Sequence, residues 1–250
     1  MSILEVRDLD LCFFSGKGEE IHAVNRVSFG LEDGEFLGLV GESGCGKSTI
    51  AKLLMGLLIP DSGQVFLEGA ALRYPFPRST YRDIQMIFQI PTESFDPRRT
   101  IGSCIADMQR NFGISRKEAK ARTLSYLDKV GLGPAFYNKY PHQMSGGECQ
   151  RAAIARAFAV EPKVVICDEI TSSLDVSVQA QVVELLQQLR EQFHISLLFI
   201  SHDLGLVHGL CDRVLVMYKG QIVEEGAASE VVHHPKNDYT KSLLASVLSV

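Results

Sequence analysis

The 250-residue sequence contains no long apolar run and no tryptophan, and its six cysteines are scattered singly. A helix needs about 20 mostly apolar residues to cross a bilayer, so no membrane-spanning helix is predicted. The first residues lack the apolar segment of a secretory signal, which favours the cytoplasm. Because there is no C-x-x-C pair, a disulfide scaffold or a zinc site is also disfavoured.

An excess of positive charge is absent too. The chain has 25 Lys and Arg against 30 Asp and Glu, which gives a net charge of −5. Nucleic-acid binders usually carry a basic surface, so no nucleic-acid partner is expected. The hydrophobic share of 46% and the charged share of 22% are ordinary for a folded globular protein.

What is present is a succession of strand and helix patterns. Because buried strands alternate with helices, the sequence predicts an α/β fold with a mostly parallel sheet. We expect one domain over 1–250, with a core from 1–88 and 159–226, an inserted helical subdomain over 89–158 and a tail over 227–250. The expected strands are 4–14, 23–31, 36–40, 163–167 and 195–200, with a turn at 15–18, and the expected helices are 48–58, 119–130 and 178–193. Ser115 and Glu118 resemble a capping box before the helix 119–130, and the tail is expected to form a turn and one short amphipathic helix.

A glycine-rich loop, GESGCGKS, follows the expected strand 36–40 and opens a helix. It fits the pattern GxxxxGK[ST], in which backbone N–H groups and a helix N-terminus face phosphate. Lys47 is expected to neutralise the β- and γ-phosphates, and Ser48 to ligate Mg²⁺. A chance match in a turn is the weaker alternative. The expected phosphate-binding residues are Gly41, Ser43, Gly44, Cys45, Gly46, Lys47, Ser48 and Thr49.

Two carboxylates, Asp168 and Glu169, end the apolar strand 163–167. Ligands bind at this edge of open α/β sheets. Asp168 is therefore expected to hold Mg²⁺, and Glu169 to orient or deprotonate the water that attacks the γ-phosphate. An acidic pair that merely faces solvent would be the usual reading of these two residues alone, but together with the loop it is the less favoured one.

The segment MSGGECQRAAIARA from Met144 resembles the signature motif of ATP-binding-cassette (ABC) ATPases. This resemblance implies an ABC cassette: a P-loop core with a mostly parallel sheet, an N-terminal antiparallel β part and an inserted α-helical subdomain. It also implies ATP hydrolysis with Mg²⁺. Ser145, Gly146 and Gly147 would contact the γ-phosphate held by a second cassette, so that two nucleotides lie between two cassettes.

Further residues match the family one by one. Gln89 matches the glutamine that contacts Mg²⁺ or the attacking water, Asp175 matches the aspartate that couples the two sites, and His202 matches the histidine that contacts the γ-phosphate. Phe13, with Phe14 as the fallback, would stack on adenine. The simpler alternatives are a surface glutamine, a structural histidine and core phenylalanines.

Two departures from the family pattern stand close to these residues. Ile170 replaces a proline and so removes a backbone constraint without removing a chemical group. Glu148 replaces the signature glutamine and would place a carboxylate near a triphosphate. Like charges repel strongly in low-dielectric surroundings, so this half-site is expected to bind ATP more weakly than the intact motif.

The stretch 89–101 and the tail 234–244 resemble ATPases of peptide, nickel and metallophore importers. Because the sequence stops soon after that tail, the favoured cargo is nickel, another transition metal or an opine metallophore. The alternative is a di- or oligopeptide importer, and a non-transport regulatory ATPase is less favoured. His233 and His234 are interpreted as part of a solvated tail rather than as a nickel site.

The resemblance also implies partners. These are a second homologous cassette, in a heterodimer or alternatively a homodimer, two membrane permeases and, indirectly, an extracytoplasmic solute-binding protein. The chain would then act as a peripheral protein on the cytoplasmic face of the membrane. A nucleotide-binding module without turnover is disfavoured, because Lys47 and Glu169 are both intact.

Overall fold

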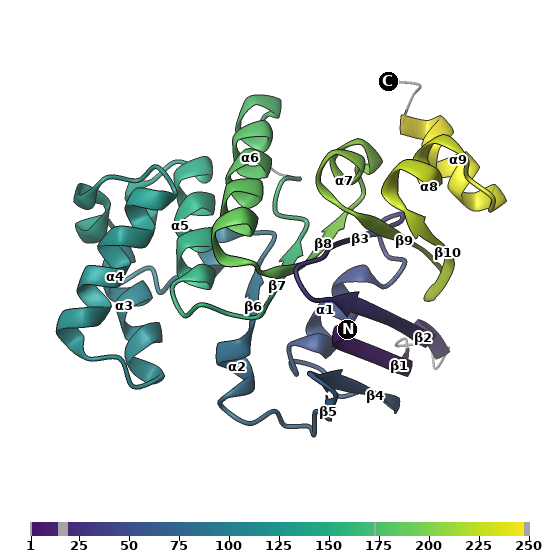
Figure 1. Ribbon diagram of the computed structural model, residues 1–250, viewed down its shortest axis with the longest axis horizontal. Helices are drawn as coiled ribbons and strands as arrows, with labels where there is room; N and C mark the ends of the chain where they lie inside the picture. The colour runs from purple at the N-terminus through teal and green to yellow at the C-terminus, as the bar shows by residue number, and fades with distance from the viewer. Residues whose placement is uncertain (1, 15–19, 173, 248–250) are drawn as a thin grey trace. The chain divides into compact units, whose positions relative to one another are not determined.

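The computed structural model describes residues 2–14, 20–172 and 174–247. They form two compact units, one from Met1–Pro77 and His194–Val250 and the other from Arg78–Phe193 (Figure 1). The turn expected at 15–18 lies outside the described residues. The functional division expected at residues 88, 159 and 227 stays a prediction.

The first unit contains two sheets. The antiparallel sheet has the order β2-β1-β4-β5, and in the other β3 runs parallel to β8 and β9 while β10 closes the edge antiparallel to β9. All residues of β3 and β8 are buried, which fits their continuous apolar sequences. The elements are β1 (Ser2–Phe14), β2 (Glu20–Glu32), β3 (Phe36–Val40), α1 (Lys47–Leu54), β4 (Ser62–Leu67), β5 (Ala70–Ala71), β8 (Ser196–Ser201), α7 (Leu204–Leu210), β9 (Arg213–Tyr218), β10 (Gln221–Ala227), α8 (Ala228–His233) and α9 (Asp238–Val247).

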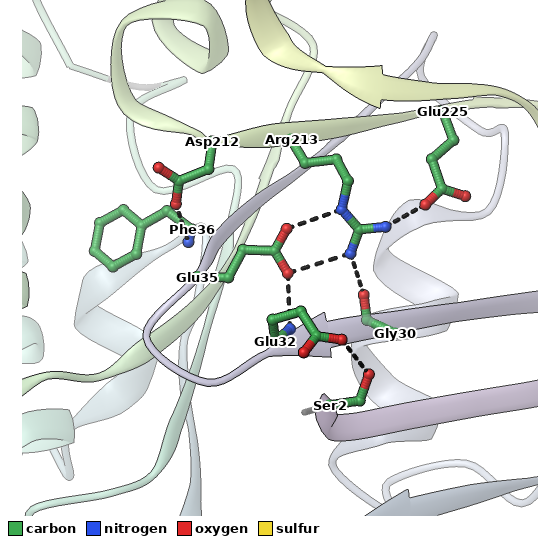
Figure 2. A network of polar contacts seen from close by, with 8 residues as sticks. All are labelled: Ser2, Gly30, Glu32, Glu35, Phe36, Asp212, Arg213 and Glu225. Carbon is green, nitrogen blue, oxygen red and sulfur yellow. Dashed lines mark hydrogen bonds and ion pairs between the residues drawn. The ribbon is translucent and has the colours of Figure 1, made fainter.

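A polar network fixes the start of β3 (Figure 2). Arg213 donates from Nε to Glu35 Oε1 at 2.8 Å and also to the Gly30 carbonyl and to Glu225. Asp212 accepts the Phe36 N–H at 2.9 Å. The hydrogen bond with Glu35 is the main cause that raises the pKa of Arg213. The network therefore ties β2, β9 and β10 to the strand that leads into the glycine-rich loop.

The second unit pairs two parallel strands and carries a group of helices, of which α3, α4 and α5 pack on one another (Figure 1). Ser115 caps α4 as expected, accepting the Glu118 N–H at 3.3 Å. Its elements are α2 (Thr80–Asp83), β6 (Ile84–Ile87), α3 (Ile101–Asn111), α4 (Arg116–Lys129), α5 (Gly146–Phe158), β7 (Val164–Asp168), α6 (Val176–Phe193) and the 3₁₀ turns Pro91–Ser94, Pro134–Asn138 and Pro141–Gln143.

Two helical segments differ from the sequence prediction in where their helices begin and end. The helix expected over 48–58 ends at Leu54, and Gly56 follows with φ +67°. The tail holds two short helices, α8 and α9, instead of one. Within the described part of the chain, no helix combines the length and apolar character needed to cross a bilayer.

Candidate functional site

The glycine-rich loop between β3 and α1 is shaped by two close backbone approaches. Gly41 and Gly46 have φ values of +155° and +112°. A Cβ atom on Gly41 would lie 2.2 Å from the Met217 carbonyl oxygen, and one on Gly46 would lie 2.1 Å from that of Ala23. Only glycine fits at either position. Strands β2 and β9 thereby hold the loop where it turns into the N-terminus of α1.

Lys47 is the buried cation of this loop, with 4% of its surface exposed. Its Nζ donates to the carbonyl oxygens of Gly41 at 2.8 Å and Glu42 at 3.0 Å. The ammonium group therefore folds back onto the loop at a helix N-terminus, an arrangement suited to anionic phosphate oxygens. The remaining expected residues lie beside it: Ser43 and Gly44 are exposed, Cys45 is buried, and Gly46, Ser48 and Thr49 are half-buried.

The C-terminal tail contacts the same loop. The Tyr239 hydroxyl accepts the Glu42 backbone N–H at 3.0 Å, and its ring packs at a tilt against the Tyr218 ring with centroids 4.2 Å apart. Glu224 anchors the tail by accepting the Asn237 N–H at 3.0 Å, and Asn237 in turn accepts the Tyr239 N–H at 2.8 Å. The tail motif that contains Tyr239 resembles one branch of the family, but the sequence does not predict that this tyrosine contacts the loop.

We predict that Tyr239→Phe weakens ATP binding about two- to tenfold, the range that corresponds to one hydrogen bond. The ring contact with Tyr218 is retained, whereas the Glu42 N–H loses its acceptor. Nucleotide titration of the purified variant measures the change, with Tyr137→Phe as the matched control in the other unit. Equal dissociation constants for wild type and Tyr239→Phe would mean that the tail does not position the loop.

In the second unit, parallel pairing brings together side chains that are distant in sequence. Gln89 lies two residues after β6, and Glu169 follows β7 directly. Gln89 Nε2 donates to Glu169 Oε2 and to Ser172 Oγ, each at 3.3 Å. Asp168 closes β7 and is 6% exposed. The structure therefore places two predicted catalytic residues, Gln89 and Glu169, in contact at the carboxyl edge of the strand pair.

The backbone of Glu169 adopts an uncommon conformation for a residue with a side chain, with φ at +48°. Ser172 Oγ donates to the Glu169 carbonyl at 2.9 Å, which helps to hold that conformation. Ile170 is fully buried, so core packing fills the position where the family pattern has proline. Such backbone conformations concentrate at functional sites.

The signature segment forms the N-terminus of α5. Ser145 Oγ accepts the Glu148 N–H at 3.3 Å, and Glu148 Oε2 accepts the Ser145 N–H at 2.8 Å. This reciprocal capping box lowers the pKa of the Glu148 carboxyl, the Ser145 backbone hydrogen bond being the largest cause. Ser145 and Gly146 are exposed, while Gly147 packs beside Val178, where an added Cβ would lie 2.9 Å from Cγ1.

The remaining predicted site residues differ in their hydrogen bonds and in their exposure within each unit. Asp175 caps α6 through Oδ1, which accepts the Val178 N–H at 3.0 Å; its pKa is lowered chiefly by the Ser177 hydroxyl. His202 follows β8 and is exposed. Phe13 and Phe14 are 42% and 75% exposed, so neither is a core residue. Ser48, Gln89 and Asp168 each carry a side-chain oxygen, the donor type that Mg²⁺ prefers.

Comparison with known proteins identifies the family to which this chain belongs. The family model described as "ABC transporter" matches residues 24–172, and the chain belongs to this family. It is 47% identical to the oligopeptide transport ATP-binding protein OppF of Escherichia coli (strain K12), over 98% of this chain and 77% of OppF. It is 46% identical to the glutathione import ATP-binding protein GsiA of Pectobacterium atrosepticum, over 91% of this chain and 37% of GsiA.

Solved structures agree with the family assignment. CbiO1 of Clostridium perfringens, described as part of an ABC transporter complex, superposes with a TM-score of 0.81 at 27% identity, covering 93% of this chain and 91% of CbiO1. A dimeric ATP-binding cassette in a post-hydrolysis state with ADP and Pi superposes with a TM-score of 0.80 at 26% identity, covering 90% of this chain and 98% of that cassette.

These similarities confirm the expected cassette fold and the expected activity. The protein is the ATPase subunit of an ABC importer: it binds ATP, hydrolyses it with Mg²⁺ and works with transmembrane permease subunits.

Proposed function

We propose that the importer powered by this subunit takes up oligopeptides or glutathione-like peptides. The supporting observation is the 47% identity to an oligopeptide transport ATP-binding protein along 98% of the chain. The preference for a metal cargo depended only on the short tail, which is weaker evidence than similarity along nearly the whole chain. The comparisons thus favour the peptide alternative over nickel or metallophore import.

In the proposed mechanism, Lys47 and the N–H groups from Gly41 to Thr49 hold the phosphates of ATP, and Phe13 stacks on adenine. Ser48, Asp168 and Gln89 would hold Mg²⁺, which would neutralise charge on the phosphates. Glu169 accepts a proton from the attacking water, whose oxygen forms the new bond to the γ-phosphorus as the bond to ADP breaks. Gln89, hydrogen-bonded to Glu169 at 3.3 Å, orients that carboxylate, and His202 contacts the γ-phosphate.

The exposed N-terminus of α5 is proposed to complete the site of a partner cassette. Ser145, Gly146 and Gly147 would bind the partner's γ-phosphate, because the helix N-terminus carries partial positive charge. Asp175 would couple the two sites across the dimer. A homologous second cassette is the proposed partner, with a homodimer as the alternative.

Glu148→Gln is predicted to raise the ATP affinity of the assembled complex about two- to fivefold, because it removes a negative charge near the triphosphate. A glutamine oxygen can still accept the Ser145 N–H, so the capping box keeps its geometry. Glu118→Gln, at the equivalent position of α4, is the matched control. Unchanged ATP affinity and turnover in Glu148→Gln would refute the idea that this carboxylate weakens the half-site.

Uptake assays test the cargo. In a strain lacking the chain, the wild type should restore uptake of a labelled tripeptide or glutathione, and the Glu169→Gln variant should not. The same strain is tested with labelled Ni²⁺. Restored nickel uptake without peptide uptake would overturn the peptide proposal and support metal import instead.

The proposed partners are two permeases, contacted through residues 89–99, and indirectly an extracytoplasmic solute-binding protein. The chain would lie peripherally on the cytoplasmic face of the membrane, and no nucleic acid would take part. Co-purification with candidate cassettes tests the heterodimer. A stable homodimer that hydrolyses ATP and supports uptake without another cassette would contradict it.

A further inference from the structure

Three side chains able to ligate a metal ion meet on the β1–β2 hairpin, and none of the three has a role in the proposed ATP mechanism. Asp10 and Cys12 lie two residues apart on β1, and His22 is the register partner of Cys12 on β2. Residues two apart on a strand point to the same face, and directly paired residues have neighbouring side chains. Strand pairing therefore gathers a carboxylate, a thiol and an imidazole in one place.

The distances suit coordination of a single ion. Cys12 Sγ lies 3.0 Å from His22 Nδ1 and 3.9 Å from Asp10 Oδ1, and His22 Nδ1 lies 4.0 Å from Asp10 Oδ1. Four donors arranged tetrahedrally at about 2.0–2.3 Å from a metal ion lie about 3.3–3.8 Å apart. The three separations bracket that range, so small side-chain rotations suffice to place one ion among the three donors.

Neighbouring hydrogen bonds already orient two of the three residues. Asp10 Oδ2 accepts the Arg26 N–H at 3.3 Å, while Oδ1 faces the thiol. The backbone N–H of Cys12 donates to Asp61 Oδ2 at 2.7 Å. Asp10 and Cys12 are half-buried and His22 is exposed. Outer contacts of this kind tune metal affinity, and the exposed side leaves an entry path and a position for water.

We propose that Asp10, Cys12 and His22 form a binding site for a borderline divalent transition-metal ion of the Zn²⁺ class, with water as the fourth ligand. A thiolate and an imidazole favour such ions, whereas Mg²⁺ and Ca²⁺ prefer all-oxygen sites. On binding, the S–H bond of Cys12 breaks, its proton goes to solvent, and a sulfur–metal bond forms without any change of oxidation state. The open position distinguishes this arrangement from closed structural zinc sites.

The scattered cysteines argued against a zinc site at the level of sequence, because no two of them form a C-x-x-C pair. Here the ligands come from two strands, and only the pairing of Cys12 with His22 brings them together. The proposal does not depend on the proposed cargo or on ATP hydrolysis.

Cobalt binding to the full-length protein, stripped of metal with a chelator, tests the site. Co²⁺ titration of the wild type should give a near-ultraviolet thiolate-to-cobalt absorption band that saturates at one equivalent, and Zn²⁺ should abolish it. Cys12→Ser should lose the band, and His22→Gln should weaken Co²⁺ binding at least tenfold. Cys104→Ser, which changes another half-buried cysteine, should behave as wild type.

Thermal unfolding of each variant without metal checks that the fold persists. Absence of a saturable band in the wild type, or an equal band in Cys12→Ser, would overturn the proposal. Loss of the band in Cys104→Ser with retention in Cys12→Ser would do so as well, because the metal would then sit at a different cysteine.

Discussion

Replacing Glu169 with glutamine is expected to lower ATP hydrolysis by the assembled transporter about 10²- to 10⁴-fold, the contribution typical of a positioned general base. Glutamine has nearly the same shape as glutamate but cannot accept a proton from water. Gln89, which donates to Glu169 Oε2 at 3.3 Å, would still have an oxygen to bond. ATP binding should therefore persist while turnover is lost.

Phosphate release and nucleotide binding should be measured on the same preparation. Glu191→Gln is the matched control, because Glu191 is exposed on α6 in the same unit. If Glu169→Gln kept near-wild-type turnover, another group would have to activate the water. If it lost ATP binding as well, Glu169 would serve in binding the nucleotide instead of acting only in hydrolysis.

Lys47→Met is expected to weaken ATP binding about 30-fold or more, because removing one member of a buried charge pair costs about 2–5 kcal/mol. Lys47 is 4% exposed, and its ammonium group donates to the carbonyl oxygens of Gly41 and Glu42. The methionine side chain is of similar length and apolar, so it fills the space without supplying charge. Nucleotide titration measures the effect.

Lys52→Met is the matched control, since Lys52 is exposed on the same helix. Thermal unfolding should be recorded for both variants, because Lys47→Met also removes two hydrogen bonds to the loop. An unchanged dissociation constant in a folded Lys47→Met protein would contradict the assignment of the loop to phosphate binding.

Local sequence was sufficient for the elements whose pattern is self-contained. The loop from Gly41 to Ser48 could be recognised because tight turns need glycine and a phosphate needs a cation at a helix N-terminus. The buried strands were predictable from continuous apolar runs. The N-cap of α4 at Ser115 followed from its spacing to Glu118.

Contacts between distant segments could not be predicted in this way. Tyr239 reaches Glu42 only because Glu224 on β10 anchors the tail beside the loop. This contact depends on how the tail docks against the loop, and sequence spacing alone does not decide that.

By itself, the sequence determined the chemistry of this protein: a phosphate-binding loop, a strand ending in two carboxylates, a signature helix and no run long enough to span a bilayer. Those features depend on residue types at short spacing, which local geometry converts directly into structure. Tertiary structure decided which distant groups meet, namely Gln89 with Glu169, Tyr239 with the loop, and Asp10 and Cys12 with His22. Strand register and tail docking are collective results of packing, so no single segment encodes them.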